Sequence, residues 1–142
     1  MKKLLACCIL VGVGFSLALL ITDDAKQTQA AAAKAKEPMV AHCVYFSLQD
    51  NSAEAKQKIV DACKEHLSGH DGTAFFAAGT RAEDAAGPIN DKDYDIALVI
   101  VFEDKAGLDK YSTASRHLQF ISENRAAFKG VRVFDAYVEA AK

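Results

Sequence analysis

The chain has 142 residues, of which 51% are hydrophobic and 25% are charged, and its formal net charge at pH 7 is −2. This length allows one ordinary domain, and this composition excludes a disordered chain. The weak acidity and the lack of basic runs argue against nucleic acid as a partner, because that affinity depends on Lys and Arg side chains that neutralise phosphates.

The N-terminal segment carries an export or membrane-anchoring pattern. Lys2 and Lys3 precede an apolar run of 18 residues that ends at Ile21. A positive segment before a hydrophobic one is typical of a signal peptide, and 18 apolar residues are also just long enough to span a bilayer. We therefore expect an exported protein, periplasmic or extracellular, with residues 1–22 either cleaved as a signal or retained as a membrane anchor. Residues 23–38 are rich in Ala and Lys and are expected to form a tether.

The remaining residues, 39–142, are predicted to form one globular domain. Segments rich in apolar, β-branched and aromatic residues predict strands at 39–48, 73–81, 94–102 and 131–138. Helical spacing of apolar residues predicts helices at 53–68, 105–111 and 115–128, with glycines at 69 and 130 as stops. A polar loop at 82–93 separates the second strand from the third.

This order of elements is the ferredoxin-like, split βαβ plan, an α+β fold with a four-stranded antiparallel sheet and helices on one face. In the first strand His42 and Phe46 share one face, while Cys43 and Tyr45 share the other. The helices leave this second face bare, which is uncommon in a stable monomer, so we expect a homodimer with sheet packed on sheet. Cys43 and Cys63 fall on different elements and faces, and are expected to remain two buried thiols.

Three titratable side chains are candidates for a binding or catalytic site. His42 lies on the apolar face of the first strand, and Tyr111 and His117 lie six residues apart around a helix break. A histidine can serve as a general base near neutral pH, and a tyrosine can donate a hydrogen bond to a developing enolate. For all three, a purely structural role stays open. The expected walls of the site are apolar: Val44, Phe46, Ile59, Cys63, Leu118 and Ile121.

The other notable polar residues, His70 and Asp135, are not predicted to take part in the site. His70 follows the helix stop and is expected to be exposed, and Asp135, in an otherwise apolar strand, is expected to make a fixed structural hydrogen bond. A metal site built from His42, His117 and His66 would lack close ligand spacing and a carboxylate, so no metal is predicted. The chain has no phosphate-binding glycine loop or nucleophile motif, and no cofactor is predicted.

Five fragments resemble the stress-responsive A/B-barrel (Dabb) domain family, in order and with matching gaps. They are residues 40–48, 94–103, 108–111, 117–120 and 133–137. The resemblance covers residues 39–139 and implies a dimeric α+β barrel. The best-understood enzyme of that family, a plant polyketide cyclase that forms olivetolic acid, performs an intramolecular aldol condensation without metal or cofactor.

That enzyme uses a tyrosine and a histidine whose positions match Tyr111 and His117, and a first-strand histidine that matches His42. The usual His-Pro before the last histidine is replaced here, in the stretch Ala114-Ser115-Arg116. We expect the domain to bind a small apolar or carbonyl-containing molecule between sheet and helices. One alternative is a cofactor-free lyase, cyclase or isomerase that uses Tyr111 and His117, and a weaker one is a monooxygenase-like activity, so whether the chain is an enzyme stays open.

Overall fold

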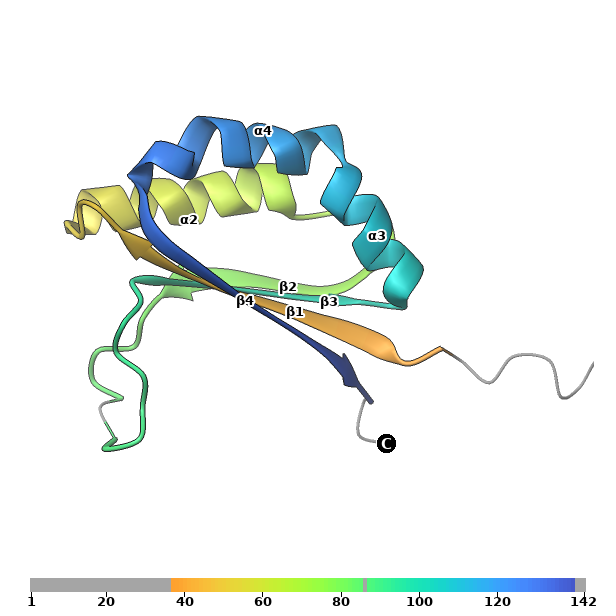
Figure 1. The fold of residues 1–142 in the computed structure, drawn as a ribbon, viewed down its shortest axis with the longest axis horizontal. Helices are drawn as coiled ribbons and strands as arrows, with labels where there is room; N and C mark the ends of the chain where they lie inside the picture. Colours follow the sequence, from red (N-terminus) through yellow and green to blue (C-terminus); the bar gives the residue numbers. More distant parts are fainter. Residues whose placement is uncertain (1–36, 86, 140–142) are drawn as a thin grey trace, which may run out of the picture. The chain divides into compact units, whose positions relative to one another are not determined.

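The structure, a computed structural model, describes residues 37–85 and 87–139. In chain order the elements are β1 (Met39–Leu48), α2 (Ala53–Leu67), β2 (Thr73–Thr80), β3 (Ile96–Phe102), α3 (Lys105–Thr113), α4 (Ser115–Asn124), the 3-10 turn η1 (Arg125–Ala127) and β4 (Phe128–Val138). The strands form one sheet in the order β2-β3-β1-β4, and every neighbouring pair is antiparallel. All three helices lie on one side of this sheet (Figure 1). The ferredoxin-like α+β prediction is therefore confirmed.

The clearest departure from the predicted elements is at the end of α4. The helix expected to reach Phe128 ends at Asn124, and Phe128 instead begins β4, paired with Leu48. The ring of Phe128 packs 4.8 Å from that of Phe46, centroid to centroid. This buried aromatic contact outweighs the helical spacing of the sequence. Gly130, the predicted helix stop, lies inside the strand.

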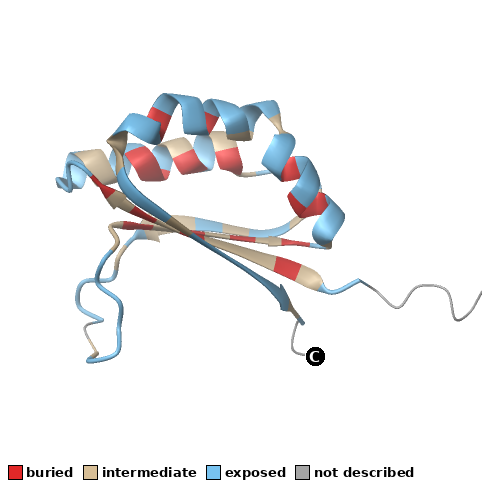
Figure 2. Cartoon of the chain, viewed as in Figure 1, coloured by how far each residue is buried: buried red, intermediate tan, exposed pale blue. Residues whose placement is uncertain are grey.

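The core lies between the sheet and the helices. Successive strand residues point to opposite faces, so alternate residues of β1 and β3 face the helices and are buried. The most deeply buried side chains come from β3, α2 and α3: Ile96, Leu98, Ile100, Phe102, Ile59, Cys63, Leu67 and Tyr111. Figure 2 shows this buried layer on the inner sides of the helices and along the middle of the sheet. The near-continuous apolar run of β3 is thus explained by a central position in the sheet.

The opposite face of the sheet is bare in the described part of the chain. By strand register it carries Phe75 and Phe134, which are 53% and 55% exposed, and the half-buried Cys43 and Tyr45. The loop that joins β2 to β3 extends on this side (Figure 1). Cys43 and Cys63 are both free thiols. Cys63 is buried as predicted, whereas Cys43 is half-buried in the single chain because it lies on the bare face.

The assignments made for residues 1–36, a signal or anchor followed by most of the tether, lie outside the described residues. Among the helices of residues 37–85 and 87–139, none is both long enough and apolar enough to cross a membrane.

Candidate functional site

His42 is held by a carboxylate from the neighbouring strand. The register of β1 and β4 places His42 opposite Asp135, on the side of the sheet that faces the helices. The Nδ1 of His42 lies 2.7 Å from Oδ1 of Asp135, and the histidine side chain is only 12% exposed. Because a carboxylate accepts, Nδ1 carries the proton, and Nε2 is left free to accept a hydrogen bond. The expected fixed hydrogen bond of Asp135 is confirmed, but its partner is a site residue.

Tyr111 is the central ring of the site. It lies on α3 and is 2% exposed. Its ring centroid is 4.5 Å from that of His117, 5.0 Å from His70, 5.7 Å from His42 and 5.2 Å from Phe102. Burial raises the pKa of Tyr111 far above its usual value of 10.0, and the nearby Cys63 thiol adds to the effect. The phenol therefore stays protonated and is a hydrogen-bond donor.

A break between two helices brings His117 onto Tyr111. Ala114 has extended backbone angles, ends α3 and begins α4. This single residue turns the chain so that the Nδ1 of His117 lies 3.1 Å from the carbonyl oxygen of Ser112. Burial lowers the pKa of His117 and outweighs the raising effect of the Ser112 carbonyl, and the neighbouring His42 and His70 lower it further. His117 is therefore a neutral imidazole at pH 7, with Nε2 as a free base.

The four histidines of the chain divide into three near Tyr111 and one elsewhere. His70, expected to be exposed, is half-buried and lies edge-on to Tyr111, with its Nε2 2.9 Å from the carbonyl oxygen of His66. His66 instead faces α4, with its Nε2 3.5 Å from an Oε2 of Glu123. The described residues contain no group of three or more His, Cys, Asp or Glu side chains arranged to hold a metal ion.

The expected apolar walls are only partly in place. Val44, Phe46, Ile59 and Cys63 are buried in the core, whereas Leu118 and Ile121 are 53% and 43% exposed. The closed pocket predicted from these six residues is therefore wrong in form. The side of α4 that faces α2 carries Arg116 and Glu123, so Leu118 and Ile121, like His117, lie on the side turned away from α2.

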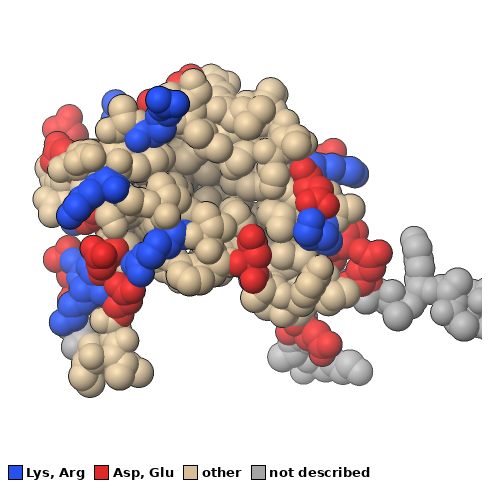
Figure 3. All heavy atoms as spheres, viewed as in Figure 1, with Lys and Arg blue, Asp and Glu red and all other residues tan. Residues whose placement is uncertain are grey.

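An open apolar groove takes the place of the closed pocket. The helix-facing residues of β4, which include Val131, Val133 and Tyr137, are also exposed. We call the space between these side chains and Leu118 and Ile121 the α4–β4 groove. Figure 3 shows it as a recessed and almost uncharged area between the helices and β4. By strand register, His42 and Asp135 lie on the same helix-facing side of the sheet as Val133.

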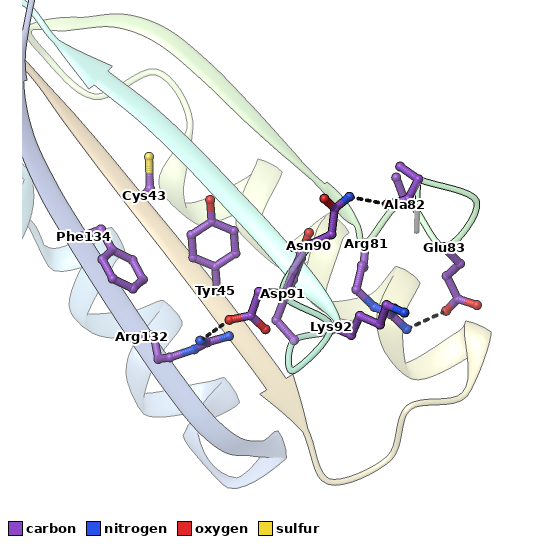
Figure 4. Close-up of a pocket in the computed structure, with 12 residues that line it drawn as sticks. Cys43, Tyr45, Arg81, Ala82, Glu83, Asn90, Asp91, Lys92, Arg132 and Phe134 are labelled. Atoms are coloured by element: carbon purple, nitrogen blue, oxygen red, sulfur yellow. Dashed lines mark hydrogen bonds and ion pairs between the residues drawn. The ribbon is translucent and has the colours of Figure 1, made fainter. Parts of the chain in front are cut away.

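A separate cavity lies on the other face of the sheet. It has a volume of about 540 Å³ and lies between the β2–β3 loop and the bare sheet face. Figure 4 shows Tyr45 and Phe134 along its wall and Arg132 paired with Asp91, with the two side chains 2.7 Å apart. None of the predicted site residues lines it. Its charged side chains largely neutralise one another, and its aromatic wall belongs to the face expected to pack in a dimer.

Comparison with known proteins gives a family and a set of similar folds. The family model described as "Stress responsive A/B Barrel Domain" matches residues 40–138. Among solved structures, a Dabb family protein with a ferredoxin-like fold from Mesorhizobium loti is 21% identical, with a TM-score of 0.60 over 74% of this chain and 100% of the other. A dimeric ferredoxin-like protein of unknown function from Thermobifida fusca is 12% identical, with a TM-score of 0.61 over 75% and 96% of the two chains.

The hydroxynitrile lyase of Passiflora edulis is a third similar structure. It is 16% identical, with a TM-score of 0.59 over 75% of this chain and 98% of the lyase. No curated protein matches the sequence. At these identities the structures establish the shared fold.

Proposed function

Because the chain belongs to the stress-responsive A/B-barrel domain family, we propose that it binds a small apolar molecule with a carbonyl group in the α4–β4 groove. The observation that carries this proposal is the meeting of Tyr111, His42 and His117 beside exposed apolar walls. A protonated, buried phenol can donate a hydrogen bond to a carbonyl oxygen. The apolar walls gain free energy when the hydrocarbon part of the ligand covers them, at about 25 cal/mol per Å².

A matched pair of ligands tests the proposal on the full-length protein. The probes are 2-octanone and 2-methyl-1-octene, in which a methylene group replaces the carbonyl oxygen. At ten times its Kd a ligand adds about 1.4 kcal/mol to stability. In a domain of this size that corresponds to a rise in Tm of roughly 6–11 °C.

We expect the ketone to raise Tm more than the alkene, and the difference to disappear in Tyr111→Phe, which keeps the ring and loses the donor. An equal response to both ligands would show that Tyr111 does not recognise the carbonyl. The lack of any response would refute binding in the groove.

The protonation states of Tyr111 and His117 favour a second function, acid–base catalysis at the carbon next to a carbonyl group. Tyr111 is protonated and His117 is neutral, with ring centroids 4.5 Å apart. In such a reaction Nε2 of His117 takes a proton from the carbon beside the carbonyl, and the Tyr111 hydroxyl stabilises the oxygen that gains charge. A protein of similar fold, from Passiflora edulis, is a hydroxynitrile lyase.

A proton-exchange experiment distinguishes catalysis from binding alone. NMR in D₂O follows deuterium entering the carbon next to the carbonyl of 2-octanone. Catalysis predicts exchange above the buffer rate in the wild type and its loss in His117→Ala. If 2-octanone still binds but exchanges at the buffer rate with both the wild type and His117→Ala, the domain binds the ketone without catalysing proton transfer.

We also propose that two copies of the domain associate through the bare sheet face. Tyr45 lies 5.0 Å from Tyr94 and 5.9 Å from Phe134, ring centroid to ring centroid, in a partly exposed aromatic cluster. Such a cluster gains stability when a second apolar face covers it. The similar protein from Thermobifida fusca is described as dimeric.

The remaining proposal concerns the segment that lies outside the described residues. We propose that residues 1–22 direct export and act as a cleaved signal or a membrane anchor, because a positive start precedes 18 apolar residues. The intact mass of the protein isolated from its native cell separates the two forms. Recovery in the cytosolic fraction with residues 1–22 present would refute export.

A further inference from the structure

A second, smaller recess also has Tyr111 in its wall. It has a volume of about 290 Å³ and lies between the turn that joins α2 to β2 and the junction of α3 with α4. Its wall residues are Gly69, His70, Asp71, Lys110, Tyr111, Ala114 and Arg116. Neither His42 nor His117 lines this recess, so it is distinct from the α4–β4 groove.

The turn on one side of the recess is fixed by its own glycines and by α3. Gly69 and Gly72 have positive φ angles of 65° and 78°, which favour glycine. The amide of Thr73 donates to the carbonyl of His70 at 3.1 Å, and that of Glu103 donates to the carbonyl of Gly72 at 2.8 Å. A Cβ at Gly72 would lie 3.2 Å from the Cα of Gly107, so the turn packs closely on α3.

This fixed turn holds the His70 ring in the wall of the recess. Its Nε2 lies 2.9 Å from the carbonyl oxygen of His66, so Nε2 carries the proton and Nδ1 is left for another partner. The ring lies edge-on to Tyr111, at an interplanar angle of 89°.

The recess is lined by more positive than negative charge. Lys110 comes from the end of α3, Arg116 from the first turn of α4, and Asp71 is the single carboxylate of the wall. The guanidinium of Arg116 donates one hydrogen bond to the backbone carbonyl of Glu65. This neutral partner positions the guanidinium without cancelling its charge, and leaves other N–H groups available.

We propose that this recess is a binding site for a small oxyanion, a carboxylate or a phosphate group, held by Arg116 and Lys110 beside the His70 ring. The guanidinium supplies planar paired donors, and the ammonium supplies a point charge. The ligand is either a free anion or the anionic group of a larger molecule. The site does not depend on a ligand in the α4–β4 groove.

The test uses the full-length protein, with inorganic phosphate and acetate as separate probes at pH 7 and constant ionic strength. NMR signals of His70 and Tyr111 report the recess, and those of Tyr45, on the opposite face of the sheet, serve as an internal reference. We expect saturable shifts at His70 and Tyr111 with at least one probe, and the stronger probe identifies phosphate or carboxylate chemistry.

Arg116→Gln should weaken binding about tenfold or more, as is usual for a charged hydrogen-bond partner. Arg125→Gln, on an exposed arginine outside the recess, is the matched control and should leave binding unchanged. Lys110→Gln provides a second variant that keeps the bond between Arg116 and Glu65. The inference is overturned if neither probe gives saturable shifts, if sodium chloride gives the same shifts, or if Arg116→Gln and Lys110→Gln both bind as the wild type does.

Discussion

His117→Ala separates a functional histidine from a structural one. The substitution removes the ring that packs on Tyr111 and the hydrogen bond from Nδ1 to the carbonyl of Ser112. If the α4–β4 groove binds a carbonyl compound, this change should weaken binding or stop turnover while the fold persists. If His117 is only structural, the main result should be a loss of stability.

The structure limits how large that loss can be. Ser112 is exposed, so water can replace the histidine at its carbonyl, and the lost hydrogen bond costs about 1 kcal/mol. The lost contact between the His117 and Tyr111 rings costs roughly another 0.5–1.5 kcal/mol. A sum of about 2 kcal/mol lowers Tm by roughly 8–16 °C in a domain of this size.

Urea unfolding and a titration with 2-octanone are measured on the same samples. The matched control is His66→Ala, which removes another half-buried histidine and its contact with Glu123 on α4. We expect the control to lose some stability and to keep the ligand affinity of the wild type. Unchanged affinity in His117→Ala, or a loss above about 4 kcal/mol, would refute the reasoning, because the lost contacts account for about half of that.

Three further predictions concern pH, assembly and thiol chemistry. Burial lowers the pKa of His117 below its usual 6.5 in the folded state, so the unfolded state binds more protons as the pH falls below that value. The domain should therefore be less stable at pH 5 than at pH 7. Urea unfolding at both pH values should therefore show a larger difference in the wild type than in His117→Ala, and equal differences would contradict this origin. Tyr45→Glu should dissociate the proposed dimer or unfold it, because it places a charge in an apolar interface; a wild-type monomer at micromolar concentration in sedimentation would argue against the interface. Burial raises the pKa of Cys63 to about 12, so peptide mapping after alkylation should find this thiol unmodified until denaturant is added, whereas rapid labelling in native buffer would show that α2 opens.

The fold could be predicted because the hydrophobic patterns of the separate strands and helices agree with the ferredoxin-like order of elements. Alternation in β1 and the apolar run of β3 identify the two central strands, and both match the sheet. The end of α4 was not predictable from spacing. Phe128 continues the helical pattern of Phe120 and Ile121, but its contact with Phe46, far away in the sequence, draws it into the strand.

The sequence singled out three side chains, His42, Tyr111 and His117, that lie close together in the structure, but it predicted their surroundings less well. The partner of His42 could have been found, because aligning the outer ends of β1 and β4 places Asp135 opposite it. The position of His70 could not, since it depends on the packing of Gly72 on Gly107, which joins separate parts of the chain. The open form of the groove follows from the edge position of β4, which leaves Val131 and Val133 without a neighbour on one side.

Under the proposed function, the edge position of β4 gives the α4–β4 groove freedom to change its ligand preference. Val131, Val133 and Tyr137 are exposed, so shortening or enlarging them alters little of the core. Tyr111 and the residues beneath it, by contrast, are buried and constrained by packing. If the proposed function holds, ligand preference and folding depend on largely different residues. A library of substitutions on the outer strand could then be screened for new ligands without prior stabilisation of the domain.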